Sequence, residues 1–181
     1  MQFKKIKNPI LRTIIELAVA IAFAMAVALL FVNFIMRGAN IDGSSMEPTF
    51  NHKDKVFTSK IPYYFNAPQP GDVVIFPSPV KEKDVFVKRI IGLPGDEVSV
   101  KDGCICINAE KIDDSFGVAE AVESDIQYPY IIPENSYFVL GDNRPFSHDS
   151  RYSDVNLIPK SKLMGKVIFR YWPFDKSGVI E

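Results

Sequence analysis

A long uncharged apolar run near the N-terminus constrains this chain more than any other feature. Residues 17–31 read LAVAIAFAMAVALLF, and only Asn33 interrupts the apolar residues before Met36. Roughly 20 such residues, each rising about 1.5 Å in a helix, match the ~30 Å hydrocarbon core of a bilayer. A lone strand would leave its backbone polar groups unpaired in lipid. The sequence therefore predicts one transmembrane helix over residues 13–36.

The same run has a second interpretation, a removable signal peptide, because small residues alternate along it. The apolar region of a signal peptide usually spans only about 7–15 residues, and it ends at a small-x-small cleavage site. Residues 33–37 (NFIMR) offer no such site. We therefore predict an uncleaved anchor.

Alanines along the predicted helix form two stripes with i,i+4 spacing: Ala18, Ala22 and Ala26, and Ala20, Ala24 and Ala28. Small residues at this spacing let two helix backbones approach closely, which is compatible with weak self-association in the membrane. Alanine is equally common in helices that face only lipid, so the pattern leaves both interpretations open.

Charge is distributed unevenly between the two parts of the chain. Residues 1–37 carry five basic side chains against Glu16 alone: Lys4, Lys5, Lys7, Arg12 and Arg37. Basic flanks stay on the cytoplasmic side, so residues 1–12 are predicted to be cytoplasmic and residues 38–181 extracytoplasmic, in the cell membrane as a single-pass protein. The whole chain has a net charge of −1, which provides no basic field to hold nucleic acid.

Short apolar runs between turn signals dominate the chain after residue 37. The predicted strands are residues 55–58, 72–76, 85–91, 97–100, 104–107, 137–140 and 166–171. Such regular short strands are typical of a mainly β protein, here an antiparallel barrel-like β-domain. The acidic stretch 110–125 is expected to be a solvated loop, because it lacks the ligand spacing of a calcium loop. Cys104 and Cys106 are expected to be buried thiols on one strand face, and no metal or cofactor is implied.

Three polar blocks are candidates for chemistry. The first, residues 42–49 (DGSSMEPT), holds Ser45 between a flexible Gly43 and a rigid Pro48, so its hydroxyl can sit on a fixed exposed turn. A serine before proline is also a common ordinary turn. The third, residues 141–152 (GDNRPFSHDSRY), concentrates polar groups after a strand, but could equally be a loop tied by Asp–Arg pairs.

The second block, residues 86–96 (FVKRIIGLPGD), contains a lysine in an unusual setting. In an extended strand Phe86, Lys88 and Ile90 share one face, so the ammonium group has apolar neighbours on both sides. One interpretation is an edge-strand lysine whose amine reaches water. The other is a buried amine. Burial would lower its pKa from about 10.4 to roughly 7–8, so that it could act as a base near neutral pH.

Taken together, an apolar anchor followed by GSSMEPT, VKRIIGLPGD and GDNRPFSHDSR resembles the bacterial type I signal peptidase family over nearly the whole chain. The resemblance implies a membrane-anchored serine endopeptidase that cleaves signal peptides from exported preproteins after small residues at −3 and −1. It implies Ser45 as nucleophile, Lys88 as general base and Ser147 as the group that orients the lysine amine. It also implies that a further set of residues shapes the site: Asp142, Arg144, Asp149 and Arg151.

Two positions depart from the family pattern. Gly43 stands where some members have a serine whose hydroxyl helps bind the oxyanion, so the Ser45 backbone N–H would carry more of that role. Pro145, Phe146 and His148 around Ser147 also make the local geometry differ. Since Ser45 lies only eight residues beyond Arg37, an extended connection reaches about 28 Å from the bilayer, which keeps the nucleophile near the membrane surface.

Three rival interpretations remain. A Ser-His-Asp triad could use His52 or His148, although it would leave the lysine block unexplained. A non-catalytic anchored binding module would have no need for the Ser45/Lys88 pair. Self-cleaving repressors also use serine and lysine, but the anchor and the lack of a DNA-binding helix pair disfavour them.

Overall fold

The computed structural model describes residues 9–102, 104–112 and 124–180, with side chains of residues 29–35 outside the description. The chain divides into two units, Met1–Arg37 and Gly38–Glu181. Where the structure describes the first unit, it is formed by helix α1 (Pro9–Ile35). Its large apolar side chains are exposed along Ile10–Val27, and the segment Pro9–Ala28 is long and apolar enough to cross a membrane. An exposed ion pair joins Arg12 and Glu16 on its first turns.

The second unit is built from antiparallel β-sheet. Within the described residues, an eight-stranded sheet has the order β1-β2-β11-β3-β4-β9-β10, with β12 paired to β11. Its strands are β1 (Arg37–Asn40), β2 (Lys55–Ser59), β3 (Val73–Pro77), β4 (Val85–Gly92), β9 (Ser136–Leu140), β10 (Ile158–Pro159), β11 (Gly165–Trp172) and β12 (Gly178–Val179). A four-stranded sheet has the order β7-β6-β5-β8. Its strands are β5 (Glu97–Lys101), β6 (Cys104–Ile107), β7 (Glu110–Lys111) and β8 (Tyr130–Ile131).

This architecture confirms the predicted mainly β, antiparallel fold with an N-terminal apolar helix. The described strands form two open sheets and do not close into a barrel. Short helices punctuate the strands: α2 (Pro62–Phe65), η2 (Arg144–Phe146), η3 (Lys160–Lys162) and η4 (Phe174–Lys176). The acidic stretch 110–125 was predicted as a loop, but Glu110–Lys111 form strand β7 by pairing with β6; residues 113–123 lie outside the described residues. Cys104 and Cys106 are free thiols on β6; Cys106 is buried as predicted, but Cys104 at the start of the strand is only half-buried, so the prediction is wrong for it.

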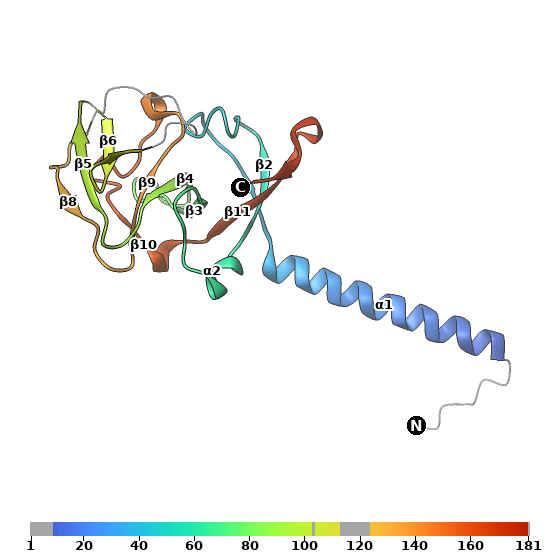
Figure 1. Cartoon of the computed structure of the whole chain (residues 1–181). Coiled ribbons are helices and arrows are strands. Elements are labelled where there is room, and N and C mark those ends of the chain that lie inside the picture. Colours follow the sequence, from blue (N-terminus) through green and yellow to red (C-terminus); the bar gives the residue numbers. More distant parts are fainter. Residues whose placement is uncertain (1–8, 103, 113–123, 181) are drawn as a thin grey trace. The chain divides into compact units, whose positions relative to one another are not determined.

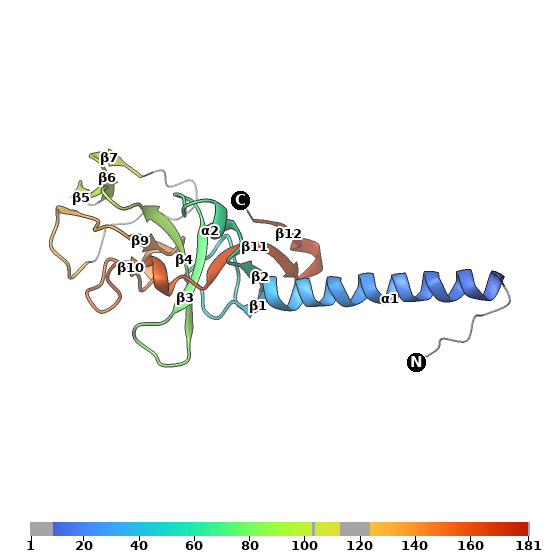
Figure 2. The ribbon, with the colours of Figure 1, turned by 90° about the horizontal axis from the view of Figure 1, so that it is seen from below.

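Strand β4 lies in the interior of the larger sheet, between β3 and β9 (Figure 1). Residues 87–90 of this strand are all buried, so both of its faces are covered. On one side, Val74 and Phe76 of β3 pack with Ile90. The smaller sheet packs beside β4 and β9, as Figure 2 also shows. Consecutive residues of a strand point to opposite faces, so Lys88 and Arg89 enter two different buried environments.

Candidate active site

Ser45 lies in the turn after β1, where buried neighbours fix its position. Met46 is almost fully enclosed, and Phe50 is fully enclosed. The Phe50 N–H donates to the Met46 carbonyl at 2.8 Å, which closes the turn. Gly43 has φ +94°, a left-handed conformation that side chains rarely adopt. Gly43 therefore provides the left-handed backbone conformation with which the chain enters the turn of the half-buried Ser45.

Lys88 is a buried residue of a central strand. It pairs with Val74 of β3, and its side chain is only 3% exposed. This position corrects the alternative of an edge-strand lysine whose amine reaches water. The Lys88 Nζ lies 2.8 Å from Ser45 Oγ, and 5.3 Å from the centre of the Phe86 ring.

Burial lowers the pKa of Lys88 from 10.5 to about 8, because desolvation disfavours the ammonium form. The charge of Arg151 lowers the pKa further, while those of Asp149 and Asp142 raise it. Desolvation is the largest of these effects. An amine with this pKa is neutral in a useful fraction of molecules near neutral pH, which a general base requires.

Asp149 organises the third polar block. Its fully buried carboxylate accepts hydrogen bonds from the Gly141 N–H at 3.0 Å, Ser147 Oγ at 2.6 Å and Arg151 Nε at 2.8 Å. Arg151 Nη2 also donates to the Arg144 carbonyl, and Arg144 Nε donates to the Gly141 carbonyl. The structure therefore brings Arg144, Ser147, Asp149 and Arg151 together as one buried network.

The Ser147 hydroxyl donates to Asp149, and a role of Ser147 in orienting Lys88 remains a prediction. Gly141 lies between this serine and the turn that holds the candidate nucleophile Ser45 (residues 43–50, the nucleophile turn). A Cβ atom at Gly141 would overlap both Ser147 Oγ and the Ser45 carbonyl oxygen. Only glycine lets these two segments approach so closely.

Asp142 belongs to a second buried network on the other face of β4. Arg89 Nε and Nη2 donate to its two carboxylate oxygens at 2.9 and 2.8 Å, and Thr49 Oγ1 donates at 2.6 Å. Because Thr49 follows the nucleophile turn, this bidentate pair connects that turn to β4 and to the third block.

Four residues of the site region were not singled out from the sequence: Thr49, Arg89, Gly141 and Asn143. All four stand inside the three quoted blocks. A buried aspartate such as Asp142 needs a cationic or hydroxyl partner. This requirement could have pointed to Arg89, which stands next to Lys88 in the second block. Asn143 donates its backbone N–H to the Ser45 carbonyl and its side-chain amide to the Ser44 carbonyl, contacts that the sequence did not reveal.

A pocket of about 300 Å³ opens beside the Ser45–Lys88 contact. Apolar side chains from the nucleophile turn and from β4 line it, together with two residues of the third block: Ile41, Met46, Val85, Phe86, Val87, Phe146 and His148. A wider hollow of about 780 Å³ shares Gly43, Phe86 and His148 with it and extends to the loop between β3 and β4. The Ser45 hydroxyl and the Lys88 amine therefore face a continuous cleft.

The two histidines have other partners. His148 Nε2 lies 2.8 Å from Asp154 Oδ1, and its ring stacks on Tyr152. His52 Nδ1 accepts the Gly43 N–H at 3.2 Å. Among the described contacts, Ser45 Oγ is hydrogen-bonded to Lys88 and not to a histidine. The described residues also contain no group of three His, Cys, Asp or Glu side chains placed to hold a metal.

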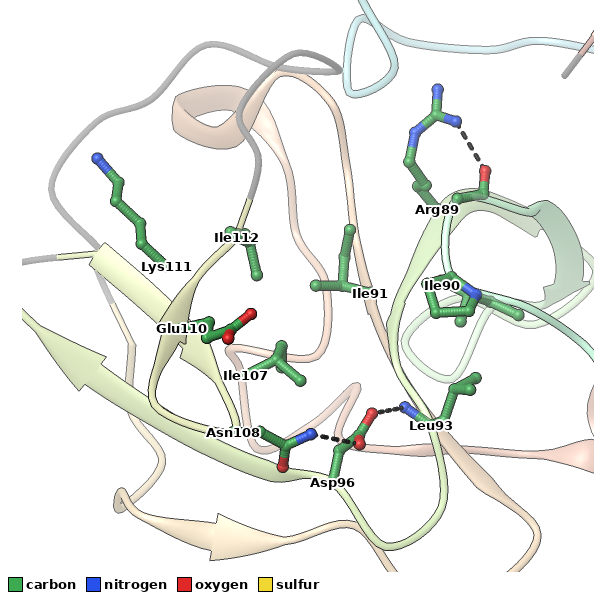
Figure 3. Close-up of a pocket in the computed structure, with 12 residues that line it drawn as sticks. Arg89, Ile90, Ile91, Leu93, Asp96, Ile107, Asn108, Glu110, Lys111 and Ile112 are labelled. Atoms are coloured by element: carbon green, nitrogen blue, oxygen red, sulfur yellow. Dashed lines mark hydrogen bonds between the residues drawn. The ribbon is translucent and has the colours of Figure 1, made fainter.

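A separate hollow of about 620 Å³ lies between β4 and the smaller sheet (Figure 3). Ile91, Leu93 and Ile107 form its apolar wall, and Asp96 joins Leu93 N–H and Asn108 at its rim. Arg89 lines it and donates to the Gly71 carbonyl. Neither Ser45 nor Lys88 lines this hollow.

Comparison with known proteins decides the family. The family model described as "Signal peptidase, peptidase S26" matches residues 14–172. The chain belongs to this family. It is therefore a serine endopeptidase of the signal peptidase I type, which confirms the resemblance and the enzyme class inferred from the sequence. Membership of this family supports the cleavage of signal peptides by a serine peptidase.

Individual relatives are similar to this chain over different shares of its length. Signal peptidase I S of Bacillus subtilis is 37% identical over 175 residues, covering 91% of this chain and 92% of that protein. Probable signal peptidase I-2 of Synechocystis sp. is 36% identical over 183 residues, covering 98% of this chain and 82% of that protein. A solved signal peptidase I from Enterococcus faecalis is 30% identical, with a TM-score of 0.44, covering 56% of this chain and 97% of that one.

Proposed function

We propose that this signal peptidase works through a Ser45/Lys88 dyad. The observation that supports it best is the 2.8 Å separation between Ser45 Oγ and the nitrogen of a buried lysine. This distance suits a hydrogen bond in either direction. A protonated amine donates to the hydroxyl, and a neutral amine accepts the hydroxyl proton.

The proposed cycle conserves its protons within the dyad. Neutral Lys88 takes the proton of Ser45 as Oγ attacks the scissile carbonyl carbon, giving a tetrahedral oxyanion. The C–N bond then breaks, and the ammonium returns a proton to the leaving amine, which leaves an acyl-enzyme. Water attacks the ester while Lys88 accepts a proton from it. That proton passes back to Ser45 Oγ as the acid product leaves.

The oxyanion is expected to bind the Ser45 backbone N–H. Gly43 has no side-chain donor to add, and its own N–H is directed to His52 Nδ1. A backbone N–H held before the reaction stabilises the developing charge without reorganisation. Two buried networks have a supporting role in this proposal, since they hold the nucleophile turn against β4. Their members are Asp142, Arg144, Ser147, Asp149 and Arg151.

The cleft also supports the proposed preference for small residues at −3 and −1. The pocket beside Ser45 measures about 300 Å³, at the lower end of ligand pockets. Ile41, Met46 and Val87 make its wall apolar, so a short aliphatic side chain such as alanine can enter without leaving a buried polar group unpaired.

We further propose that α1 anchors the enzyme, with residues 1–12 in the cytoplasm and residues 38–181 outside it. Basic residues precede α1 and the helix carries the length and composition of a span. Tyr64 and Phe65 of α2 are 76% and 82% exposed, and they support contact of this loop with the lipid surface. Phe50, by contrast, is fully buried and belongs to the core. Weak self-association through the alanine stripes stays part of the proposal.

The deciding experiment is cleavage of a signal-bearing preprotein by the purified full chain in detergent. We expect wild-type protein to release the mature product, and Ser45→Ala and Lys88→Ala to lose cleavage by several orders of magnitude. The exposed Lys160→Ala is a matched control for loss of a lysine and should cleave normally. Cleavage that survives either dyad substitution in a folded protein would remove the proposed roles.

A further inference from the structure

Asn143 contacts two consecutive carbonyl groups of the nucleophile turn. Its backbone N–H donates to the Ser45 carbonyl at 3.0 Å, and its side-chain Nδ2 donates to the Ser44 carbonyl at 3.1 Å. The residue is half-buried and stands between Asp142 and η2. It is therefore held on one side by a buried carboxylate and on the other by a helical turn.

The hydrogen bond from the Asn143 side chain to the Ser44 carbonyl also controls the direction of the Ser45 N–H. The Ser44 carbonyl and the Ser45 N–H belong to one peptide unit, which is planar, and in a trans unit the two groups point in opposite directions. Fixing the carbonyl therefore fixes the N–H. The Glu47 N–H shares the same carbonyl at 3.1 Å, but it lies within the turn and moves with it. Asn143 is the donor that comes from outside the turn.

This direction matters because of the chemistry at Gly43. In the proposed function the oxyanion accepts a hydrogen bond from the Ser45 N–H, and residue 43, a glycine, has no hydroxyl to donate a second one. The Gly43 N–H is directed to His52. The catalytic advantage of a single donor depends on its being aligned before the reaction, since an N–H that must reorient loses part of its stabilisation.

We propose that Asn143 is a positioning residue that aims the Ser45 N–H at the oxyanion by holding the Ser44 carbonyl. The inference rests on the proposed Ser45/Lys88 function. It predicts an effect on the transition state, with little effect on substrate binding or on the titration of Lys88. If the Asn143 side chain only stabilised the fold, its removal would instead lower the free energy of unfolding and leave kcat of the folded fraction unchanged.

The test compares Asn143→Ala with a matched control in the full-length protein. Gln69→Ala removes a side-chain amide that also donates to backbone carbonyls, those of Ala67 and Pro68, away from the cleft. We expect Asn143→Ala to lower kcat by about 10- to 100-fold, with KM within about twofold of wild type. Gln69→Ala should keep kcat. The pH at half-maximal activity should be the same in wild type and Asn143→Ala.

A tetrahedral adduct gives a second readout. A peptide aldehyde ending in alanine adds the Ser45 hydroxyl to its carbonyl carbon and places an oxygen where the oxyanion forms. Its inhibition constant should rise in Asn143→Ala by about the factor by which kcat falls. Binding of the corresponding peptide amide, which forms no adduct, should be unchanged. Equal aldehyde inhibition of the two proteins, or a kcat within twofold of wild type, would overturn the proposal.

A near-isosteric variant guards against misfolding. Asn143→Asp keeps the shape of the side chain but presents acceptor oxygens to the Ser44 carbonyl, so we expect at least as large a loss of kcat on its high-pH plateau. Wild-type kcat in folded Asn143→Asp would contradict the positioning role. Ser45→Ala is measured beside these variants. If Ser45→Ala cleaves like wild type, the dyad itself fails, and that result is distinct from any result at position 143.

Discussion

The depressed pKa of Lys88 predicts how activity depends on pH. The amine has to be neutral to accept a proton, and its pKa is about 8. With a single titrating base, about a tenth of the molecules are active at pH 7 and about nine tenths at pH 9. We expect kcat/KM for a signal-peptide substrate to rise with pH in a limb whose midpoint lies near 8. An unperturbed lysine would place that midpoint above 10.

The same shift predicts a pH-dependent stability. The folded-state pKa lies below the unfolded value of 10.5, so the unfolded chain binds more protons between these two values. This contribution to the free energy of unfolding therefore rises with pH from about 8 to about 10.5. Below pH 8 the burial of Lys88 costs about 3 kcal/mol relative to a residue that does not titrate, and most of the cost is gone by pH 10.

Lys88→Met isolates this contribution, because methionine fills a similar volume and has no charge. The difference in unfolding free energy between the variant and wild type, measured by urea denaturation in detergent, should favour the variant by about 2–3 kcal/mol more at pH 7 than at pH 10. Lys160→Met, at an exposed position, should show no such trend. A difference that is constant with pH, together with an activity limb near 10, would refute the buried-amine reasoning.

Three further substitutions test other parts of the site. Replacing both His52 and His148 by alanine should leave kcat within a few-fold of wild type, and complete loss of cleavage in a folded double variant would favour a histidine triad. Asp142→Ala leaves its buried arginine partner uncompensated and should lower the free energy of unfolding by about 3–5 kcal/mol in urea titrations; a loss below 1 kcal/mol would contradict the buried ion pair. Gly141→Ala brings a Cβ atom into the Ser45 carbonyl and should abolish most cleavage, whereas a fully active variant would show that the turn can move away.

Local patterns in the sequence were sufficient for the main strands. Period-2 apolar runs and turn residues predicted strands that the structure places at β2, β3, β4, β5, β6, β9 and β11. The strands β7, β8, β10 and β12 have two residues each, too few for a pattern to emerge. Openness of the sheets depends on long-range pairing, which local periodicity does not encode.

The site was predictable to the extent that its chemistry is local. Phe86 and Ile90 predicted an apolar setting for Lys88, because neighbours two apart share a strand face, but this pattern left both an edge-strand lysine and a buried amine open. The partners of Asp142 were not predictable in this way. Their contacts join segments far apart in the sequence, Thr49 with Asp142 and Arg89 with Asp142, and depend on how β4 is covered on both faces.

The arrangement of buried charges helps to explain why the pKa of Lys88 is lowered although two carboxylates lie near it. Isolated, Asp149 and Asp142 would stabilise the ammonium form and raise the pKa of the lysine. Each is instead bound by a buried arginine, Asp149 by Arg151 and Asp142 by Arg89. At Nζ the charge of Arg151 opposes that of Asp149, and desolvation remains the largest effect on the pKa. These pairs therefore hold the nucleophile turn in place without supplying the net negative charge that would keep the amine protonated.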